Sequence, residues 1–288
     1  MTYNCNICGS NETNPIDGYN NVPLQRCDKC SGISTIQRPT EDELTSFYQD
    51  ELLRSNYFSP ITAKRYHSLL DSFEKYRQTN KKLDIGAGQG YFLEIAKERG
   101  WEVFGTEFSE ECINNAKKKD LNLYQGNVKD AQFPKDQFDV IVCIEVIEHL
   151  INPRETTDEM YRITRKGGAV YITTPNFNAI HRYRLKEQYD VITYPTHLSY
   201  FTNKSIKALF QASHLTPKRI WTSGYSFTRL KTSKGKSNQD FVSETSDDEM
   251  FRRRLEKSPI LRGIKSILNG VLNLFKIGDS LKGIFVKR

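Results

Sequence analysis

From residue 80 onward, apolar and polar positions follow two periods in turn along this chain. Short apolar runs suited to buried strands lie near residues 82–86, 101–106, 121–124, 139–144, 169–174 and 218–228. Between these runs, apolar residues recur at the three- and four-residue spacing of amphipathic helices. Regular alternation of the two patterns is typical of an α/β fold, and it predicts a doubly wound, mostly parallel sheet with helices between the strands.

The remaining patterns divide the chain into further segments. Residues 41–58 and 60–78 carry helical periodicity, residues 231–250 are polar and poor in large apolar side chains, and residues 258–276 again show helical spacing. The expected organisation is a zinc-binding module over 1–40, a helical cap over 41–80, a core domain over 81–230, a flexible basic insertion with an amphipathic helix over 231–276, and a final core strand over 277–288.

Composition indicates a soluble protein with an uneven charge. Residues 229–288 contain 14 Lys and Arg against 7 Asp and Glu, so they account for the whole net charge of +7 and leave the other 228 residues neutral. A neutral core argues against a domain that grips nucleic acid. The N-terminus lacks the basic and apolar regions of a signal peptide, and no apolar run approaches the roughly 18 residues of a membrane span. We therefore expect a cytoplasmic protein with reduced thiols.

Four cysteines near the N-terminus have metal-ligand spacing. Cys5 and Cys8 form one C-x-x-C pair, and Cys27 and Cys30 form a second pair 18 residues further on. Four thiolates at this spacing can close a tetrahedral Zn²⁺ site that leaves no position open for a substrate. The interpretation is a structural zinc site, with a reduced-thiol loop or redox pair as the alternative, because residues 1–40 seem too few to fold on an apolar core alone.

The stretch from Lys82 to Glu107 predicts a cofactor site. An apolar strand enters a turn with glycines at positions 86, 88 and 90, a helical pattern follows, and a second strand ends at Glu107. The glycines let the backbone lie against a ligand, and a carboxylate at the end of the second strand is placed to bind two ribose hydroxyls. Asp84, two residues before the turn, would repel a pyrophosphate. A cationic cofactor without phosphate fits better.

Asp84, Gly86, Gly88 and Gly90 resemble the D-x-G-x-G-x-G motif of the class I S-adenosylmethionine-dependent methyltransferases, and Glu107 resembles their second-strand acid. The resemblance continues through residues 139–150, 166–176 and 197–202. It implies that Asp84 and the glycines face the methionine end of S-adenosylmethionine, that Glu107 holds the ribose, and that Asn127 stands in the adenine loop where the family usually has an acid. It also places Glu145 beside the cofactor.

The catalytic candidates lie in an E-x-x-E-H loop, Glu145 to His149, and at His197. Three interpretations stay open. His149 could act as general base, since an unperturbed imidazole titrates near neutrality. Glu145, Glu148, His149 and His197 could together hold a divalent cation, as in the small-RNA and quinone-precursor methyltransferases with this loop. The loop could also be purely structural.

The cysteine module ahead of the core resembles that of bacterial sugar and surface-polysaccharide methyltransferases. This resemblance implies methylation of a sugar hydroxyl in O-antigen or capsule biosynthesis, on a small-molecule or lipid-linked acceptor. The alternative is an RNA, tRNA or quinone-precursor O-methyltransferase. A non-catalytic binding protein is disfavoured because Asp84, the glycines and Glu107 are intact. The apolar stripe and basic residues of 251–276 predict either packing on the core or peripheral contact with the inner face of the cell membrane.

Overall fold

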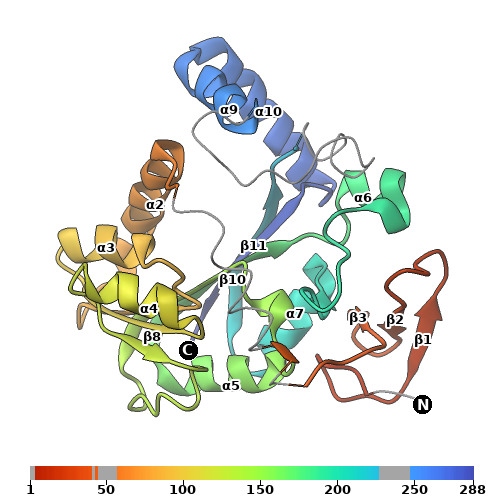
Figure 1. The fold of residues 1–288 in the computed structure, drawn as a ribbon, viewed down its shortest axis with the longest axis horizontal. Helices are drawn as coiled ribbons and strands as arrows, with labels where there is room; N and C mark the ends of the chain where they lie inside the picture. Colours follow the sequence, from red (N-terminus) through yellow and green to blue (C-terminus); the bar gives the residue numbers. More distant parts are fainter. Residues whose placement is uncertain (1–3, 41–42, 45–56, 227–246) are drawn as a thin grey trace.

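The computed structural model describes residues 4–40, 43–44, 57–226 and 247–288 (Figure 1). Its main element is a seven-stranded sheet with strand order β10-β11-β8-β7-β4-β5-β6. β4 to β8 run parallel, and β11 is antiparallel to both of its neighbours, β10 and β8. The predicted mostly parallel α/β sheet is confirmed. Its strands are β4 (Lys81–Ile85), β5 (Glu102–Glu107), β6 (Leu123–Gln125), β7 (Phe138–Ile144), β8 (Thr164–Pro175), β10 (Thr216–Ser223) and β11 (Ser280–Val286).

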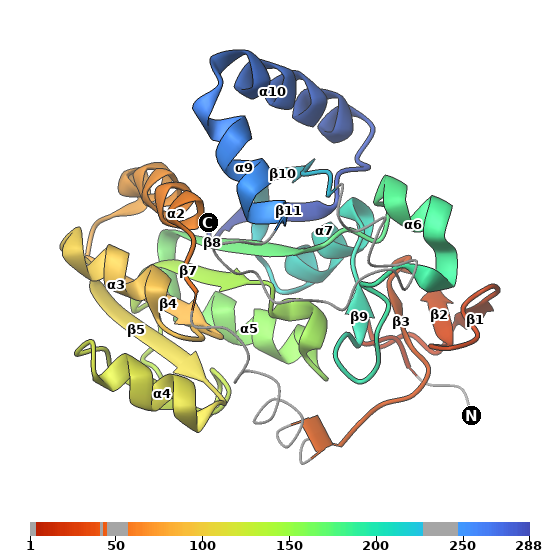
Figure 2. The ribbon, with the colours of Figure 1, turned by 45° about the horizontal axis from the view of Figure 1, so that its top comes forward.

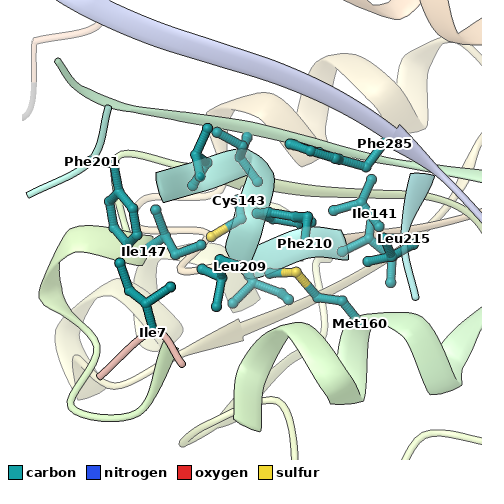
Figure 3. Packing of buried hydrophobic residues seen from close by; sticks show 14 of the residues in the cluster. Ile7, Ile141, Cys143, Ile147, Met160, Phe201, Leu209, Phe210, Leu215 and Phe285 are labelled. Carbon is teal, nitrogen blue, oxygen red and sulfur yellow. The ribbon is translucent and has the colours of Figure 1, made fainter. Parts of the chain in front are cut away.

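Helices cover both faces of this sheet (Figure 2). The alternation along β7 shows how the faces are divided: Ile141 and Cys143 pack into one buried cluster, and Val140 and Val142 pack into another. The first cluster also contains side chains of α5 and α7 (Figure 3), and the second contains side chains of α2 and α3. The helices are α2 (Pro60–Phe73), α3 (Tyr91–Glu98), α4 (Glu110–Lys117), α5 (Pro153–Ile163), α6 (Ile180–Leu185), α7 (Asn203–Ala212), α9 (Asp247–Lys257) and α10 (Pro259–Leu274), with 3-10 turns η2 (Glu74–Tyr76), η3 (Ile147–His149) and η4 (Lys186–Gln188).

A second, smaller sheet joins the N-terminal module to the core. It has the order β1-β2-β3-β9, where β1 (Thr13–Ile16), β2 (Leu24–Cys27) and β3 (Ile33–Thr35) belong to the module. β9 (Ser199–Tyr200) comes from the segment between β8 and α7, and it pairs antiparallel with β3. Ile7 of the module also inserts among core residues (Figure 3). The module is therefore continuous with the core in both hydrogen bonding and packing.

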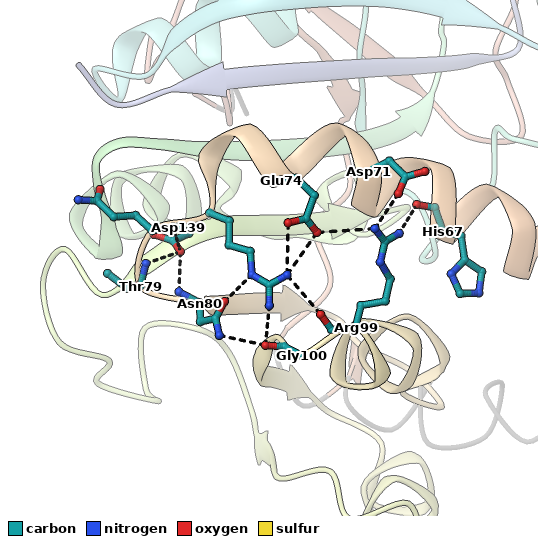
Figure 4. Close-up of polar contacts among 10 residues, drawn as sticks. His67, Asp71, Glu74, Thr79, Asn80, Arg99, Gly100 and Asp139 are labelled. Atoms are coloured by element: carbon teal, nitrogen blue, oxygen red, sulfur yellow. Dashed lines mark hydrogen bonds and ion pairs between the residues drawn. The ribbon is translucent and has the colours of Figure 1, made fainter.

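A buried carboxylate fixes the chain where it enters β4. Asp139, fully buried at the start of β7, accepts hydrogen bonds from the backbone N–H groups of residues 78, 79 and 80 at 2.7, 2.7 and 2.8 Å, as Figure 4 shows in part. Arg165 of β8 donates to its other oxygen. Burial opposes ionisation, but Arg165 and the three amides outweigh it and lower the pKa of Asp139. Two parallel strands and the preceding turn thus share one anchor.

Two expectations need comment here. Most of the helix predicted over 41–58 lies outside the described residues. His181, taken from the sequence as an ordinary surface or interface residue, is instead buried, and its Nδ1 lies 2.7 Å from a carboxylate oxygen of Asp279. The partners are far apart in sequence, and this pairing has no local signature. Among the described helices, none is long and apolar enough to cross a bilayer.

Candidate active site

The carboxyl ends of three adjacent parallel strands, β4, β5 and β7, border a cleft of about 340 Å³. This is the edge at which open α/β sheets bind ligands, and the volume suits a small molecule. Six residues predicted from the sequence line it: Gly86, Gly88, Glu107, Asn127, Glu145 and His149. The remaining lining comes from Leu44, Phe108, Val128, Lys129, Ile144, Val146, Leu150, Ile151, Asn152, Glu155 and Thr156.

The glycine turn needs glycine for two physical reasons. Gly86 and Gly88 have φ of +70° and +53°, a region that L side chains rarely adopt. In addition, a Cβ on Gly86 would lie only 2.4 Å from a methyl of Val146. Gly90 begins α3, and a Cβ there would lie 2.8 Å from Leu121. The turn therefore approaches both the cleft wall and the neighbouring helix closely.

Glu107, at the end of β5, is held in place by backbone amides. One carboxylate oxygen accepts from Gly88 N at 2.8 Å, and the other accepts from Phe108 N and Ser109 N at 2.7 and 3.0 Å. The side chain is 7% exposed, yet it lines the cleft. It is fixed before any ligand arrives, as a ribose-binding carboxylate should be.

Asp84 does not line the cleft. It is 4% exposed, and burial, with a smaller contribution from Glu107, raises its pKa to about 8 against the opposing influence of Lys82. A cation bound nearby would favour the ionised carboxylate and lower that pKa again. Its predicted service to the methionine end would therefore be electrostatic.

Asn127 lines the cleft, but its amide is already engaged. Its Oδ1 accepts from the backbone N–H groups of Lys129 and Asp130 at 2.9 and 3.0 Å, and its Nδ2 donates to the Asp130 carboxylate. The side chain therefore shapes the loop after β6. Direct contact of Asn127 with adenine remains a prediction.

The structure brings Glu148, His149 and His197 together. One potential ligand atom of each lies within 4.8 Å of the others. Glu148 and His149 belong to η3, whereas His197 comes from the loop that leads into β9, and the two imidazole centroids are 4.8 Å apart. Glu145 lies on the cleft side, with a φ of +54° that is uncommon for a residue with a side chain. It is not part of this closest group.

Both imidazoles of this cluster have a defined orientation. His149 Nδ1 lies 2.7 Å from Thr196 O, and His197 Nδ1 lies 2.6 Å from Val191 O. A carbonyl oxygen only accepts, so each Nδ1 donates and each Nε2 presents its lone pair. This is the usual arrangement of metal-binding histidines, whose other N–H is held by a carbonyl.

Burial shifts the cluster's pKa values in opposite directions. Burial, together with the charge of Glu145, raises the pKa of Glu148. Burial and the neighbouring His197 lower the pKa of His149 to about 4. A neutral imidazole is a competent ligand, but a base that weak accepts a proton poorly at pH 7. One Glu148 carboxylate oxygen has no hydrogen-bond partner among the described residues although the side chain is only 2% exposed. The donor set therefore fits a divalent cation.

The four predicted zinc ligands also converge. Their Sγ atoms all lie within 4.8 Å of one another, with 3.5 Å between Cys5 and Cys30 and 3.5 Å between Cys8 and Cys27. Thiolates about 2.3 Å from one tetrahedral zinc would lie about 3.8 Å apart. Backbone N–H groups of Ile7 and Gly32 point at two of the sulfurs, from 3.4 and 3.3 Å. The geometry fits structural zinc.

The cysteine module reaches the histidine cluster through two backbone hydrogen bonds. Thr35 N donates to Leu198 O at 3.1 Å, and Leu198 N donates to Glu148 O at 2.9 Å. The segment that carries His197 is thus held between the module's sheet and η3.

Two groups of site residues were missed by sequence reasoning. Phe108 follows the ribose acid and is 40% exposed at the cleft; an exposed aromatic directly after a buried strand was the available signal. On the other side of the histidine cluster, Phe177, Tyr189 and Tyr200 line a narrow space together with Glu148 and His197. These aromatics come from loops and short elements, which carry no periodic signal.

The fold and the cleft together define a class I S-adenosylmethionine-dependent methyltransferase domain. Residues 57–217 match a family model described as a methyltransferase domain. The chain belongs to this family.

Similarity to particular proteins is more limited. The chain is 35% identical over 108 residues to a ubiquinone biosynthesis O-methyltransferase of Azoarcus sp. (strain BH72), covering 34% of this chain and 45% of that protein. It is 26% identical over 146 residues to the protein of that name from Leptothrix cholodnii, covering 48% and 57%. The chain thus spans about half the length of these curated relatives.

Among solved structures, it superposes on geranyl diphosphate C-methyltransferase from Streptomyces coelicolor A3(2) with a TM-score of 0.60 at 11% identity, covering 88% of this chain and 100% of that one. A methyltransferase from Archaeoglobus fulgidus gives 0.54 at 19% identity, covering 84% and 99%. At these identities the likeness concerns the fold.

Proposed function

We propose that this protein transfers the methyl group of S-adenosylmethionine to a phenolic hydroxyl of a quinone precursor, with a divalent cation held by Glu145, Glu148, His149 and His197. The observation that carries the proposal is the convergence of Glu148, His149 and His197 within 4.8 Å, next to the cofactor cleft. Methyl transfer breaks a sulfur–carbon bond, forms an oxygen–carbon bond and releases the hydroxyl proton, so the acceptor oxygen must be both aligned and deprotonated.

Residues of the cleft would orient the cofactor. The Glu107 carboxylate, fixed by three amides, would accept hydrogen bonds from two ribose hydroxyls. The glycine turn would let the backbone approach the methionine portion, and buried Asp84 would favour its positive charge. The apolar wall formed by Ile144, Val146 and Phe108 would exclude water.

The histidine cluster would receive the acceptor hydroxyl. A bound divalent cation would lower the pKa of a coordinated hydroxyl. The cluster's own contribution is to hold two imidazoles in one tautomer through Thr196 O and Val191 O, and to present the buried carboxylate of Glu148 beside them. This reading is supported over His149 as sole general base because the imidazole stays neutral at physiological pH.

Two observations support an aromatic acceptor. The curated relatives named above are ubiquinone biosynthesis O-methyltransferases. In addition, Phe177, Tyr189 and Tyr200 line the space beside Glu148 and His197, where they could pack against an aromatic ring. The sugar acceptor of surface-glycan assembly, which the sequence analysis placed first, remains a prediction, as does the RNA alternative; the comparisons favour the quinone-precursor reading.

The test is a methyl-transfer assay with purified protein, S-adenosylmethionine and a catechol-type dihydroxybenzoate, with a nucleotide sugar as the competing acceptor. We expect methylation of the catechol, loss of activity with chelator, and recovery with Mg²⁺ or Mn²⁺. His197→Ala should remove activity, whereas His67→Ala, at an exposed histidine on α2, should not. Methylation of the sugar alone would overturn the acceptor. Full activity after chelation and in His197→Ala would assign the cluster a structural role.

A further inference from the structure

Helix α10 presents a large apolar face that no described part of the chain covers. Ile260, Ile267 and Leu274 are 74%, 71% and 74% exposed. The other exposed apolar residues on this helix and directly after it are Leu261, Ile264, Leu268, Val271 and Phe275. Their spacing places them along one side of the helix. A contiguous apolar face of this kind on a protein surface marks an interaction site.

The opposite side of α10 is anchored, so the direction of the apolar face is fixed. Asn269 and Asn273 accept hydrogen bonds from the backbone N–H groups of Gly224 and Thr222 at 2.9 and 3.0 Å. Thr222 Oγ1 donates to Leu272 O at 3.0 Å, and Leu272 is buried. These contacts hold the polar side of α10 against the end of the edge strand β10. Rotating the helix to bury the apolar face would break them.

Helix α9 holds the other end of this unit. Its Glu249 is fully buried and accepts from Ser59 Oγ at 2.7 Å, and Glu256 pairs with Lys265 of α10 at 2.7 Å. The two helices thus project from the sheet edge as a supported hairpin (Figure 2).

Charge decides between the two occupants that an apolar helix face could have. From 257 to 276 the chain contains Lys257, Arg262, Lys265 and Lys276, and no Asp or Glu. A second copy of this chain would bring an equally basic helix alongside, which like-charge repulsion disfavours. Anionic phospholipid headgroups complement basic residues that flank an apolar stripe.

We propose that α10 is a docking face for the surface of an anionic lipid bilayer, with the side chains of Ile260, Ile264, Ile267, Val271, Leu274 and Phe275 inserted at the boundary of headgroups and acyl chains. The Arg and Lys residues around them contact the phosphates. The inference rests on the exposed face, its anchored reverse side and its charge, and it does not depend on which acceptor is methylated.

The experiment is co-sedimentation of the full chain with vesicles of phosphatidylglycerol and phosphatidylcholine, compared with phosphatidylcholine alone. We expect binding to the anionic vesicles that weakens between about 0.1 M and about 0.5 M NaCl. Ile267→Glu should weaken vesicle binding by roughly tenfold to a hundredfold, because it removes an inserted side chain and places a charge in the apolar face. Ser266→Glu is the matched control: it adds the same charge at the neighbouring exposed position, off the apolar face, and should weaken binding by less than about fivefold.

Three results would overturn the proposal. The first is no sedimentation with anionic vesicles at low salt. The second is equal loss of binding in Ile267→Glu and Ser266→Glu, which would remove the apolar face from the interaction. The third is a concentration-dependent dimer in sedimentation velocity, dispersed by Ile267→Glu and unaffected by vesicles, which would assign the face to a second copy. Urea unfolding of both variants should match the unmodified protein, since both positions are exposed.

Discussion

Replacing Glu107 probes the cofactor cleft most directly. Its carboxylate accepts three backbone amides, from Gly88, Phe108 and Ser109, and it lines the cleft where the ribose would lie. Glu107→Ala would remove the ribose contact and release the amide of the glycine turn. Glu107→Gln would keep the volume but turn an NH₂ group toward a backbone N–H, so it would not rescue the site.

The expected loss follows from hydrogen-bond energies. One hydrogen bond to a charged group contributes about 1.5–3 kcal/mol, which corresponds to a roughly tenfold to 150-fold loss of affinity for S-adenosylmethionine. We expect Glu107→Ala to fall in or above this range, since the turn also loses its fixed partner. Stability without ligand should fall by roughly 1–3 kcal/mol, because the buried amides lose an acceptor.

Titration calorimetry with S-adenosylmethionine measures the affinity, and urea unfolding measures the stability. Glu110→Gln is the control, because it makes the same charge change three residues away at an exposed position on α4. Affinity in Glu107→Ala equal to that of the unmodified protein would refute the ribose assignment. Equal losses in Glu107→Ala and Glu110→Gln would show that only net charge matters.

Three further predictions concern the cysteine module, the histidine cluster and the core anchor. Elemental analysis should find one zinc per chain, and Cys27→Ser should lose it; turnover should then fall while affinity for S-adenosylmethionine stays within a few-fold, and an ordered, metal-free module would contradict this. His149→Ala should abolish turnover with little change in cofactor affinity by calorimetry, and unchanged turnover would leave the loop structural. Asp139→Asn should lower the free energy of unfolding in urea by about 3–5 kcal/mol, against at most about 1 kcal/mol for the exposed Asp158→Asn. Because the folded-state pKa of Asp139 is lowered, its contribution is present above about pH 4 and is lost as pH falls through the folded pKa, so the stabilities of the unmodified protein and Asp139→Asn should converge in acid.

Local patterns predicted most of the core, and long-range contacts explain what they missed. Strand β7 and the glycine turn could be read from the sequence because burial on both faces and a positive φ each restrict residue type directly. The pairing of β3 with β9 could not, since the two residues Ser199 and Tyr200 are too few to show a period. The periodicity of α10 revealed its apolar side. Only its contacts with β10 show that this side faces outward.

Shared strands limit how the cysteine module can be exchanged between proteins. β3 and β9 are neighbours in one sheet although more than 150 residues separate them in the chain. A chimera that replaces residues 1–36 alone would leave Ser199 and Tyr200 facing a strand of foreign sequence, and a deletion would expose them as an unpaired edge next to the histidine loop. The transplantable unit is therefore discontinuous. It consists of the module together with residues 197–201, and any natural recombination that kept the enzyme intact would have had to preserve both.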